Sequence, residues 1–364
     1  MDARIQPLPF DPAALRGLSR GLIASHYENN YGGAVKRLNA IRAQAAATPF
    51  ATAPGFVLNG LKREELIATN SMLLHELYFG SLGGDGVTME PAMALALGAN
   101  FGSTERWRAE FIACAKALGG GSGWMLLVFQ PREGSLVNQW AADHTHAVAG
   151  GTPILALDMY EHAYHLDYGA AAGSYVDAFM VNIDWAAVYQ RYQQAVYAAS
   201  EAFGAGQNEI GDARVLDVRR AGVHAQADSM IPGAQWRDPA AVATWSAELP
   251  RDHELVVYCV YGHEVGRATA LRLRAAGLNA RFLRGGIDGW QAAGRPLADR
   301  PAHDTPYRAR CGRGAPAAPA RPQADSGGSP PRQARRQGLA AALRLPTAVP
   351  RPNRQRSPSE RQTR

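Results

Sequence analysis

The stretch 158–168 constrains this chain more than any other, because it combines a carboxylate with an imidazole. Asp158 directly follows an apolar run typical of a strand, and His162 comes four residues later. An aspartate at a strand end and a histidine in the next turn can bind one metal ion from two sides. Two earlier segments with helical periodicity each contain one more histidine, His26 and His75. Three imidazoles and one carboxylate suit a redox-capable first-row metal, so the set indicates an enzyme.

Taken one at a time, these side chains also have ordinary structural explanations. A lone histidine on an apolar helical stripe, such as His26 or His75, is more often a hydrogen-bonded core residue than a ligand. His165 and Tyr168 are interpreted as packing or surface residues. The prediction of a metal site therefore depends on all four candidate ligands occurring together.

The length and composition indicate more than one folded domain. The 364 residues are 46% hydrophobic, which is ample for real cores. The chain contains no apolar run of about 18 residues, so no membrane-spanning helix is predicted. Its three cysteines, Cys114, Cys259 and Cys311, are too few and too scattered for a disulfide framework. Together with a start that lacks a secretory signal pattern, this predicts a cytoplasmic protein.

The net charge of +6 belongs to the C-terminal tail. The 13 arginines and three acids after residue 300 give the tail +10, which leaves −4 for the first 300 residues. The folded part therefore offers no electrostatic basis for binding nucleic acid. Residues 299–364 are rich in Pro, Arg, Ala and Gly, which predicts disorder. An unconstrained extension is favoured over an anion- or RNA-binding tail.

Hydrophobic periodicity predicts an N-terminal half of the α+β class. Apolar stripes indicate helices over 12–45 and 62–80, which would form a helical hairpin domain over residues 1–90. An α/β domain is predicted over 91–203. It is expected to contain helices over 104–118 and 174–203 and strands over 124–129, 136–141 and 153–159.

A second unit is predicted after a linker at 204–209. Strands at 215–218, 255–259 and 280–283 alternate with a helix at 265–276. Such alternation is typical of a parallel sheet covered on both faces, which predicts a separate α/β domain over residues 210–298.

Four motifs in residues 5–200 resemble those of the iron/manganese superoxide dismutases. They are His26-Tyr27 with Leu38-Asn39, His75-Glu-Leu-Tyr-Phe79, Gly121-Ser-Gly-Trp124 and the stretch from Asp158 to Tyr168. The resemblance implies a helical hairpin followed by an α/β domain, with the metal between them. Position by position, it implies that one iron ion, with manganese as the alternative, is bound by His26, His75, Asp158 and His162. Solvent would be the fifth ligand, and Trp124 and Tyr78 would wall the pocket.

His144 stands where many members of this family have a glutamine that hydrogen-bonds the solvent ligand. The other location of that glutamine, four residues before the second ligand, is Ser71, which is too short to reach. His144 is therefore the candidate for tuning the solvent ligand, and His146 is the second choice. The residue at this position affects the choice between iron and manganese, and we favour iron.

The first helix departs from the family pattern at two positions. The family usually has a histidine four residues and a tyrosine eight residues after the first ligand, and here these are Asn30 and Ala34. A proton-relay and access-limiting phenol is therefore missing. Tyr31 lies nearby, but its side chain would lie about 60° round the helix axis from that of residue 34. We expect metal binding to survive and the turnover rate to change.

Glu161 resembles a glutamate that accepts a hydrogen bond from the ligand histidine of a second subunit. Such a contact is isologous, so the resemblance implies a homodimer with two-fold symmetry. Tyr164 would lie at the same interface, although its usual histidine partner is Asn30 here.

Residues 210–298 resemble a rhodanese-like domain, through Leu216-Asp-Val-Arg219, Ile231-Pro-Gly-Ala234, Val257-Tyr-Cys259 and Gly285-Gly286. The resemblance places Cys259 in a loop whose N–H groups form an anion nest that lowers the pKa of the thiol. Glu264 opposes an anionic sulfur donor there through like-charge repulsion. A buried, unreactive Cys259 is the alternative. The loop also resembles those of rhodanese domains found with chromate-resistance proteins.

The sequence thus predicts a superoxide dismutase fused to a rhodanese-like domain, with superoxide as substrate and a joint role against oxidative or oxyanion stress. One alternative is a sulfurtransferase that depends on Cys259 and has a weakened dismutase site. Another is a metal-dependent dimer that binds a partner or senses oxidants, which the changes at Asn30 and Ala34 favour.

Overall fold

The computed structural model describes residues 2–301. The tail for which the sequence predicts disorder lies outside the described residues from residue 302 onward. Among the helices of residues 2–301, none combines the length and the apolar character needed to cross a membrane.

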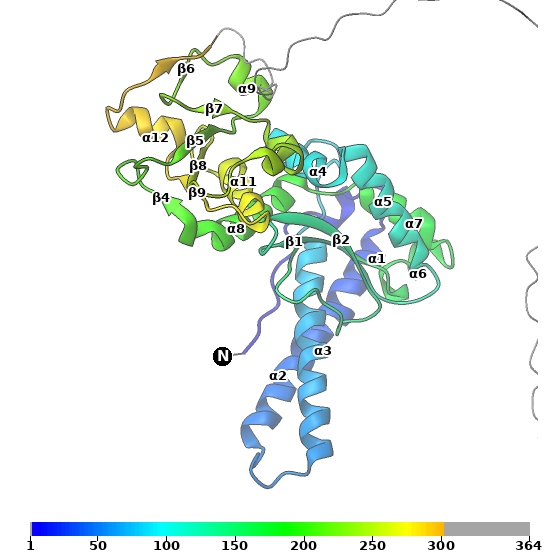
Figure 1. Cartoon of the computed structure of the whole chain (residues 1–364). Helices are drawn as coiled ribbons and strands as arrows, with labels where there is room; N and C mark the ends of the chain where they lie inside the picture. Colours follow the sequence, from blue (N-terminus) through cyan, green and yellow to red (C-terminus); the bar gives the residue numbers. More distant parts are fainter. Residues whose placement is uncertain (1, 302–364) are drawn as a thin grey trace, which may run out of the picture. The chain divides into compact units, whose positions relative to one another are not determined.

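The N-terminal half contains two long helices, α2 and α3, that lie side by side as an antiparallel hairpin (Figure 1). The segment 12–45, predicted as helical with Ser19 as a plausible N-cap, is interrupted, because Gly17 adopts a left-handed φ of +74°. The α-helix then restarts after Ser19, whose hydroxyl accepts a hydrogen bond from the Leu22 N–H at 3.0 Å. The elements are η1 (Pro12–Ala14), α1 (Arg20–Ser25), the π-helical turn η2 (His26–Tyr31), α2 (Gly32–Ala47) and α3 (Gly55–Phe79). Helix α3 starts earlier than predicted.

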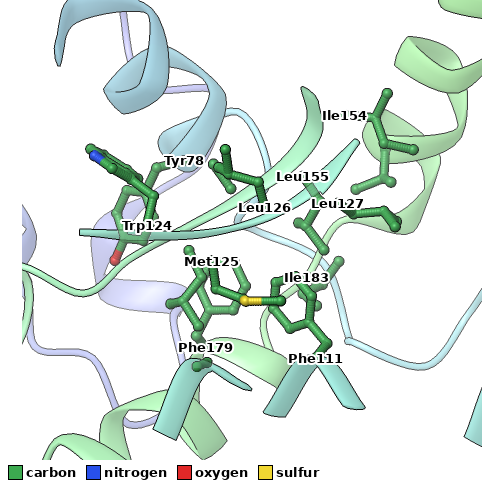
Figure 2. Close-up of a cluster of buried hydrophobic side chains, with 14 of the residues drawn as sticks. Tyr78, Phe111, Trp124, Met125, Leu126, Leu127, Ile154, Leu155, Phe179 and Ile183 are labelled. Atoms are coloured by element: carbon green, nitrogen blue, oxygen red, sulfur yellow. The ribbon is translucent and has the colours of Figure 1, made fainter. Parts of the chain in front are cut away.

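A three-stranded antiparallel sheet follows, with the strand order β2-β1-β3. Its strands are β1 (Trp124–Gln130), β2 (Ser135–Ala141) and β3 (Thr152–Asp158), close to the predicted ranges. Six of the seven residues of β1 are buried, because side chains pack on both faces of the sheet. Figure 2 shows Phe111, Phe179 and Ile183 gathered around Met125 on one face, with Trp124 and Leu126 on the other.

Helices surround this sheet, and several of them differ from the prediction. The segment 174–203 is not one helix, because the chain breaks at 181–184 and Asp184 caps a new helix by accepting hydrogen bonds from the N–H groups of Ala186 and Ala187. Helix α4 was not predicted. The helices are α4 (Pro91–Phe101), α5 (Thr104–Ala117), η3 (Glu161–Ala163), α6 (His165–Tyr168), α7 (Ala172–Met180), α8 (Trp185–Ser200) and η4 (Glu201–Phe203).

The second half contains the predicted parallel sheet, with the order β4-β9-β8-β5-β7. Its edge strand β4 (Gly204–Ala205) falls in the segment predicted as a linker. The other strands are β5 (Arg214–Asp217), β7 (Gln235–Trp236), β8 (Leu255–Tyr258) and β9 (Ala280–Leu283), with a separate pair β6 (Ser229–Met230) and β10 (Ala298–Asp299). The helices are α9 (Ala221–Ala225), η5 (Pro239–Ala241), α10 (Val242–Trp245), η6 (Ser246–Glu248), α11 (Glu264–Ala275) and α12 (Gly286–Ala292).

Helix α11 packs against α8, so the two halves share buried contacts. Ala268 and Leu271 of α11 belong to the same buried cluster as the residues of β1. Arg272 donates a hydrogen bond to the Ala99 carbonyl oxygen of α4 at 2.9 Å. Residues 2–301 accordingly lie within one compact unit.

Candidate metal centre

Four elements from three separate regions of the sequence bring the four predicted ligands together. His26 begins η2, His75 lies near the end of α3, Asp158 ends β3 and His162 lies in η3. One ligand atom from each lies within 4.8 Å of the others. The three helix and strand residues are buried, whereas the His162 side chain is 27% exposed. The site therefore has one side that small solutes can approach.

One carboxylate oxygen is the centre of this cluster. Asp158 Oδ2 lies 3.1 Å from His26 Nε2, 3.2 Å from His162 Nε2 and 3.4 Å from His75 Nε2. The other oxygen, Oδ1, accepts a hydrogen bond from the Tyr160 N–H at 2.8 Å, which fixes the orientation of the carboxylate.

The tautomer of His75 shows that this arrangement fits a cation. His75 Nδ1 lies 2.6 Å from the Ser71 carbonyl oxygen, which can only accept, so the ring proton is on Nδ1. Nε2 then presents a lone pair to the Asp158 carboxylate, and this buried nitrogen has no hydrogen-bond partner. Two acceptors facing each other repel unless a positive charge lies between them. A metal ion at this position would supply that charge.

Burial keeps the nitrogen ligands free of protons. It lowers the pKa of His75 to about 3 and also lowers the pKa of His26, although Asp158 acts in the opposite direction. Burial by itself would raise the pKa of Asp158, but the charges and hydrogen bonds of His162 and His26 outweigh it, so this pKa is lowered. Because metals bind neutral imidazoles and ionised carboxylates, the side chains are already in their binding forms near neutral pH.

Comparison with known proteins shows the family of the N-terminal half. Residues 89–191 match the C-terminal domain of the iron/manganese superoxide dismutases. A superoxide dismutase [Fe] of Cupriavidus metallidurans is 66% identical over 192 residues, which are 53% of this chain and 97% of the relative. The chain belongs to the iron/manganese superoxide dismutase family. We call residues 5–200 the dismutase part.

Relatives named for either metal share this part. A superoxide dismutase [Mn] 1 of Halobacterium salinarum is 37% identical over 198 residues, covering 52% of this chain and 95% of the relative. A superoxide dismutase [Fe] of Aquifex aeolicus is 35% identical over 206 residues, covering 54% of this chain and 94% of the relative. Residues 202–293 match a rhodanese-like domain, and we call them the rhodanese-like part.

His144 lies beside the cluster with its orientation fixed. The indole Nε1 of Trp124 donates to His144 Nδ1 at 3.0 Å, and Asn70 Nδ2 donates to the His144 carbonyl oxygen at 2.6 Å. Its ring stacks on Tyr160, with centroids 4.8 Å apart, and lies 6.2 Å from the His75 ring. Burial lowers the pKa of His144, so the neutral ring carries its proton on Nε2.

The structure separates His144 from its second choice, His146. His146 is exposed, its Nδ1 accepts a hydrogen bond from the Ala142 N–H at 3.0 Å, and its ring lies beside Trp140. Ser71 contacts His75, but mainly through its carbonyl oxygen, since its hydroxyl is 3.4 Å from Nδ1.

Two tyrosines hold the buried side of the centre. The Tyr78 ring lies 5.0 Å from the His26 ring and is fully buried. Tyr175 donates to the Asp158 carbonyl oxygen at 2.8 Å and lies 3.2 Å from the Tyr78 hydroxyl. Sequence reasoning missed Tyr175, because its link to the centre runs through a backbone oxygen and leaves no motif.

Tyr31 has a role that the sequence did not show. Its ring is buried and lies 6.4 Å from the His75 ring. Its hydroxyl donates to Glu76 Oε1 at 2.8 Å and accepts from the Gln6 N–H at 2.7 Å, so it ties the N-terminal segment to α3. Burial raises the pKa of Tyr31 to about 12. The Tyr31 hydroxyl is thus used in two structural hydrogen bonds. Ala34, where the family usually has the tyrosine, has no phenol group.

The two residues expected at a subunit interface differ in exposure. Glu161 is exposed and precedes His162, whose side chain is 27% exposed. Tyr164 is buried at 2% exposure, with its ring 5.3 Å from that of Tyr175. Burial and then the Glu161 charge raise the pKa of Tyr164.

Cys259 directly follows strand β8 and is 6% exposed. Its loop curls tightly, since a Cβ on Gly286 would lie 2.4 Å from the carbonyl oxygens of Cys259 and Val260. Backbone N–H groups of Gly262, His263 and Gly266 act to lower the pKa of the thiol. Burial outweighs them and raises it, in contrast to the lowering that the sequence predicted.

Proposed function

We propose that this protein is a superoxide dismutase that converts two superoxide ions and two protons into O₂ and H₂O₂. The proposal assigns one iron ion per chain to His26, His75, Asp158 and His162. The observation that carries it is the unprotonated Nε2 of His75, which faces the Asp158 carboxylate with two further imidazole nitrogens around the same oxygen.

Iron is favoured over manganese because the 66% identical relative is named for iron, whereas the 37% identical relative is named for manganese. When bound, the metal would take an electron from one superoxide ion and give it to the next, which nitrogen and carboxylate ligands support. The absence of thiolates among the four proposed ligands argues against a structural zinc site.

The chain itself would supply position and protons. Trp124 holds the tautomer of His144 that carries a proton on Nε2, so the proposal gives His144 the task of donating a hydrogen bond to solvent in the centre. Burial, followed by the Asp158 charge, raises the pKa of Tyr160 to about 12. The Tyr160 hydroxyl, on the ring that stacks against His144, therefore keeps its proton at neutral pH. Trp124, Tyr78 and Tyr164 would wall the site without binding the metal.

We also propose that the protein is a homodimer in which Glu161 accepts a hydrogen bond from His162 of a second copy. The exposure of Glu161 beside a ligand that is itself 27% exposed supports this, since an isologous contact would cover both. Sedimentation of the purified protein should give a dimer that Glu161→Ala weakens and Glu133→Ala does not. A monomer at micromolar concentration would contradict it.

The proposal places the protein in a reducing cytoplasm, because the three cysteines form no framework. The proposal also gives the dismutase part and the rhodanese-like part a joint role in defence against oxidants or oxyanions such as chromate. A deletion strain as resistant as its parent to superoxide generators and to chromate would argue against that role. Sulfur transfer by Cys259 is the alternative activity, and it would persist in a protein without metal.

The test combines metal analysis with superoxide consumption on one sample. The wild type should contain one iron or manganese ion per chain and consume superoxide. His75→Ala should lose both properties, while His165→Ala, which changes an exposed histidine outside the cluster, should keep both. Cys259→Ser should leave dismutation unchanged. Undiminished dismutation in folded His75→Ala protein would reject the proposed centre.

A further inference from the structure

A cavity of about 200 Å³ lies over Cys259, and both parts of the chain line it. The rhodanese-like part contributes Cys259, the loop after it, and Arg219 and Arg220. The dismutase part contributes Glu90 and Tyr189. The surroundings of this thiol are therefore not set by the rhodanese-like part alone.

Glu264 is the residue through which the two parts meet at this cavity. It is the first residue of α11 and is 5% exposed. Tyr189 donates a hydrogen bond to its Oε1 at 2.6 Å, and Gln193 Nε2 donates to its Oε2 at 3.0 Å. Both donors lie on α8 of the dismutase part. Both oxygens of this buried carboxylate thus accept hydrogen bonds from the other part of the chain.

The start of α11 also packs directly against the sulfur. A Cβ on Gly266 would lie 3.3 Å from Cys259 Sγ, and Sγ lies 3.9 Å from the His263 carbonyl oxygen. Glu264 lies between these two residues in sequence and lines the same cavity. A carboxylate held near a thiol disfavours the thiolate. Its charge adds to the effect of burial, which raises the pKa of Cys259.

We propose that helix α8 of the dismutase part is a positioning element for Cys259. Tyr189 and Gln193 hold the Glu264 carboxylate at the wall of the cavity, and the held carboxylate sets how readily the thiol reacts. This goes beyond the dismutation reaction, because it assigns control over the rhodanese-like thiol to a helix of the other part. The titratable and charged groups around the thiol are Tyr261, His263, Glu264 and Arg267 from its loop and α11, Arg219 and Arg220 after β5, Glu90 before α4, and Tyr189 and Tyr197 of α8.

Two of the arginines around the thiol, Arg219 and Arg267, are bound to other groups. The Arg219 guanidinium is bound to the buried Asp217 carboxylate, with Nε at 2.9 Å from Oδ2. Arg267 donates to the Gly262 carbonyl oxygen at 2.9 Å and to Glu201 Oε2 at 2.9 Å. Glu264 is bound by neutral donors instead, so its charge acts on the cavity without a bound cation between them.

The experiment measures alkylation of Cys259 by iodoacetamide in the full-length, metal-loaded protein over a series of pH values. The Cys259 peptide is quantified by mass spectrometry, and Cys114 serves as the internal reference. Glu264→Gln should move the midpoint to lower pH by about one unit, which is about tenfold faster alkylation at pH 7. Glu248→Gln is the matched control. It removes an exposed carboxylate of the rhodanese-like part that does not line the cavity, and should leave the midpoint unchanged.

A double-mutant cycle tests whether α8 acts through Glu264. Tyr189→Phe should shift the midpoint in the wild-type background by at least half a unit and leave it unchanged in the Glu264→Gln background. Gln193→Leu, which keeps both Glu264 and the thiol loop, should behave in the same way. Dismutation and thermal melting of each variant report folding. An unchanged midpoint in Glu264→Gln, or equal shifts from Tyr189→Phe in both backgrounds, overturns the proposal.

Discussion

At the scale of single residues, the main result is that hydrogen bonds fix proton positions around the centre. The Ser71 carbonyl oxygen fixes the proton of His75 on Nδ1, and the Trp124 indole fixes that of His144 on Nε2. One histidine is thereby prepared to bind a cation, and the other to donate a hydrogen bond. The same side chain type has opposite roles because its neighbours differ.

This division of roles leads to a prediction for His144. His144→Leu should keep the metal, because none of the four candidate ligands is changed, and should lower the dismutation rate about tenfold or more, since a positioned proton donor is lost. His144→Gln should retain most of the rate. Metal content and a pH profile of the rate distinguish this from a structural effect. Equal rates for the leucine variant and the wild type would remove His144 from the mechanism.

At the scale of elements, backbone hydrogen bonds join the end of α3 to the break between α7 and α8. The Gly84 and Gly86 N–H groups donate to the carbonyl oxygens of Asn182 and Ile183, at 3.1 Å and 3.0 Å. The Asp184 N–H donates to the Ser81 carbonyl oxygen at 2.8 Å. This junction fixes the C-terminal end of the helix that carries His75.

We predict that Gly86→Ala destabilises this junction. Gly86 has a φ of +70°, and an added Cβ would lie 2.3 Å from the Met180 carbonyl oxygen. The loss should be about 2 kcal/mol or more, from strain and the clash together. Gly98→Ala is the control, because Gly98 lies inside α4 with open space around it. It should stabilise by about 0.5–1 kcal/mol. Urea unfolding measures both, and equal stabilities would contradict the prediction.

At the scale of the whole molecule, the described chain is built around a shared core rather than around two independent bodies. Leu271 of α11 is 4% exposed and belongs to the buried cluster of the dismutase part. A Cβ on Gly134, in the turn between β1 and β2, would lie 2.7 Å from the Leu271 Cβ. The turn between β1 and β2 can approach Leu271 this closely because Gly134 has no side chain.

This packing predicts that the two parts unfold together. Leu271→Asp should cost about 3–5 kcal/mol, the typical penalty of an unpaired buried charge. It should replace a single thermal transition by two, with dismutation lost in only one of them. Ala275→Asp, at an exposed position of the same helix, should keep one transition. Differential scanning calorimetry provides the test, and two separate transitions in the wild type would show that the interface does not couple the parts.

Much of this architecture follows from local patterns. The three strands of the first sheet, the helix from Thr104 and the parallel second sheet lie close to their predicted positions, because each has the periodicity of its own element. The errors fall at breaks in helices. Gly17 and Asp184 interrupt segments whose apolar residues continue on both sides. Hydrophobic periodicity alone does not reveal such a break in a helix. Helix α4 was missed for the related reason that it has no distinct apolar stripe.

The sequence by itself determined the kinds of ligand, their order and the family of each part, since these depend on residue types at fixed local spacings. Tertiary structure alone decided that Tyr175 donates to the Asp158 carbonyl oxygen, that Tyr31 is bound to Glu76, and that α8 holds Glu264. These contacts join segments far apart in the chain. Their existence depends on how helices and strands pack, and no short-range pattern in the sequence encodes that.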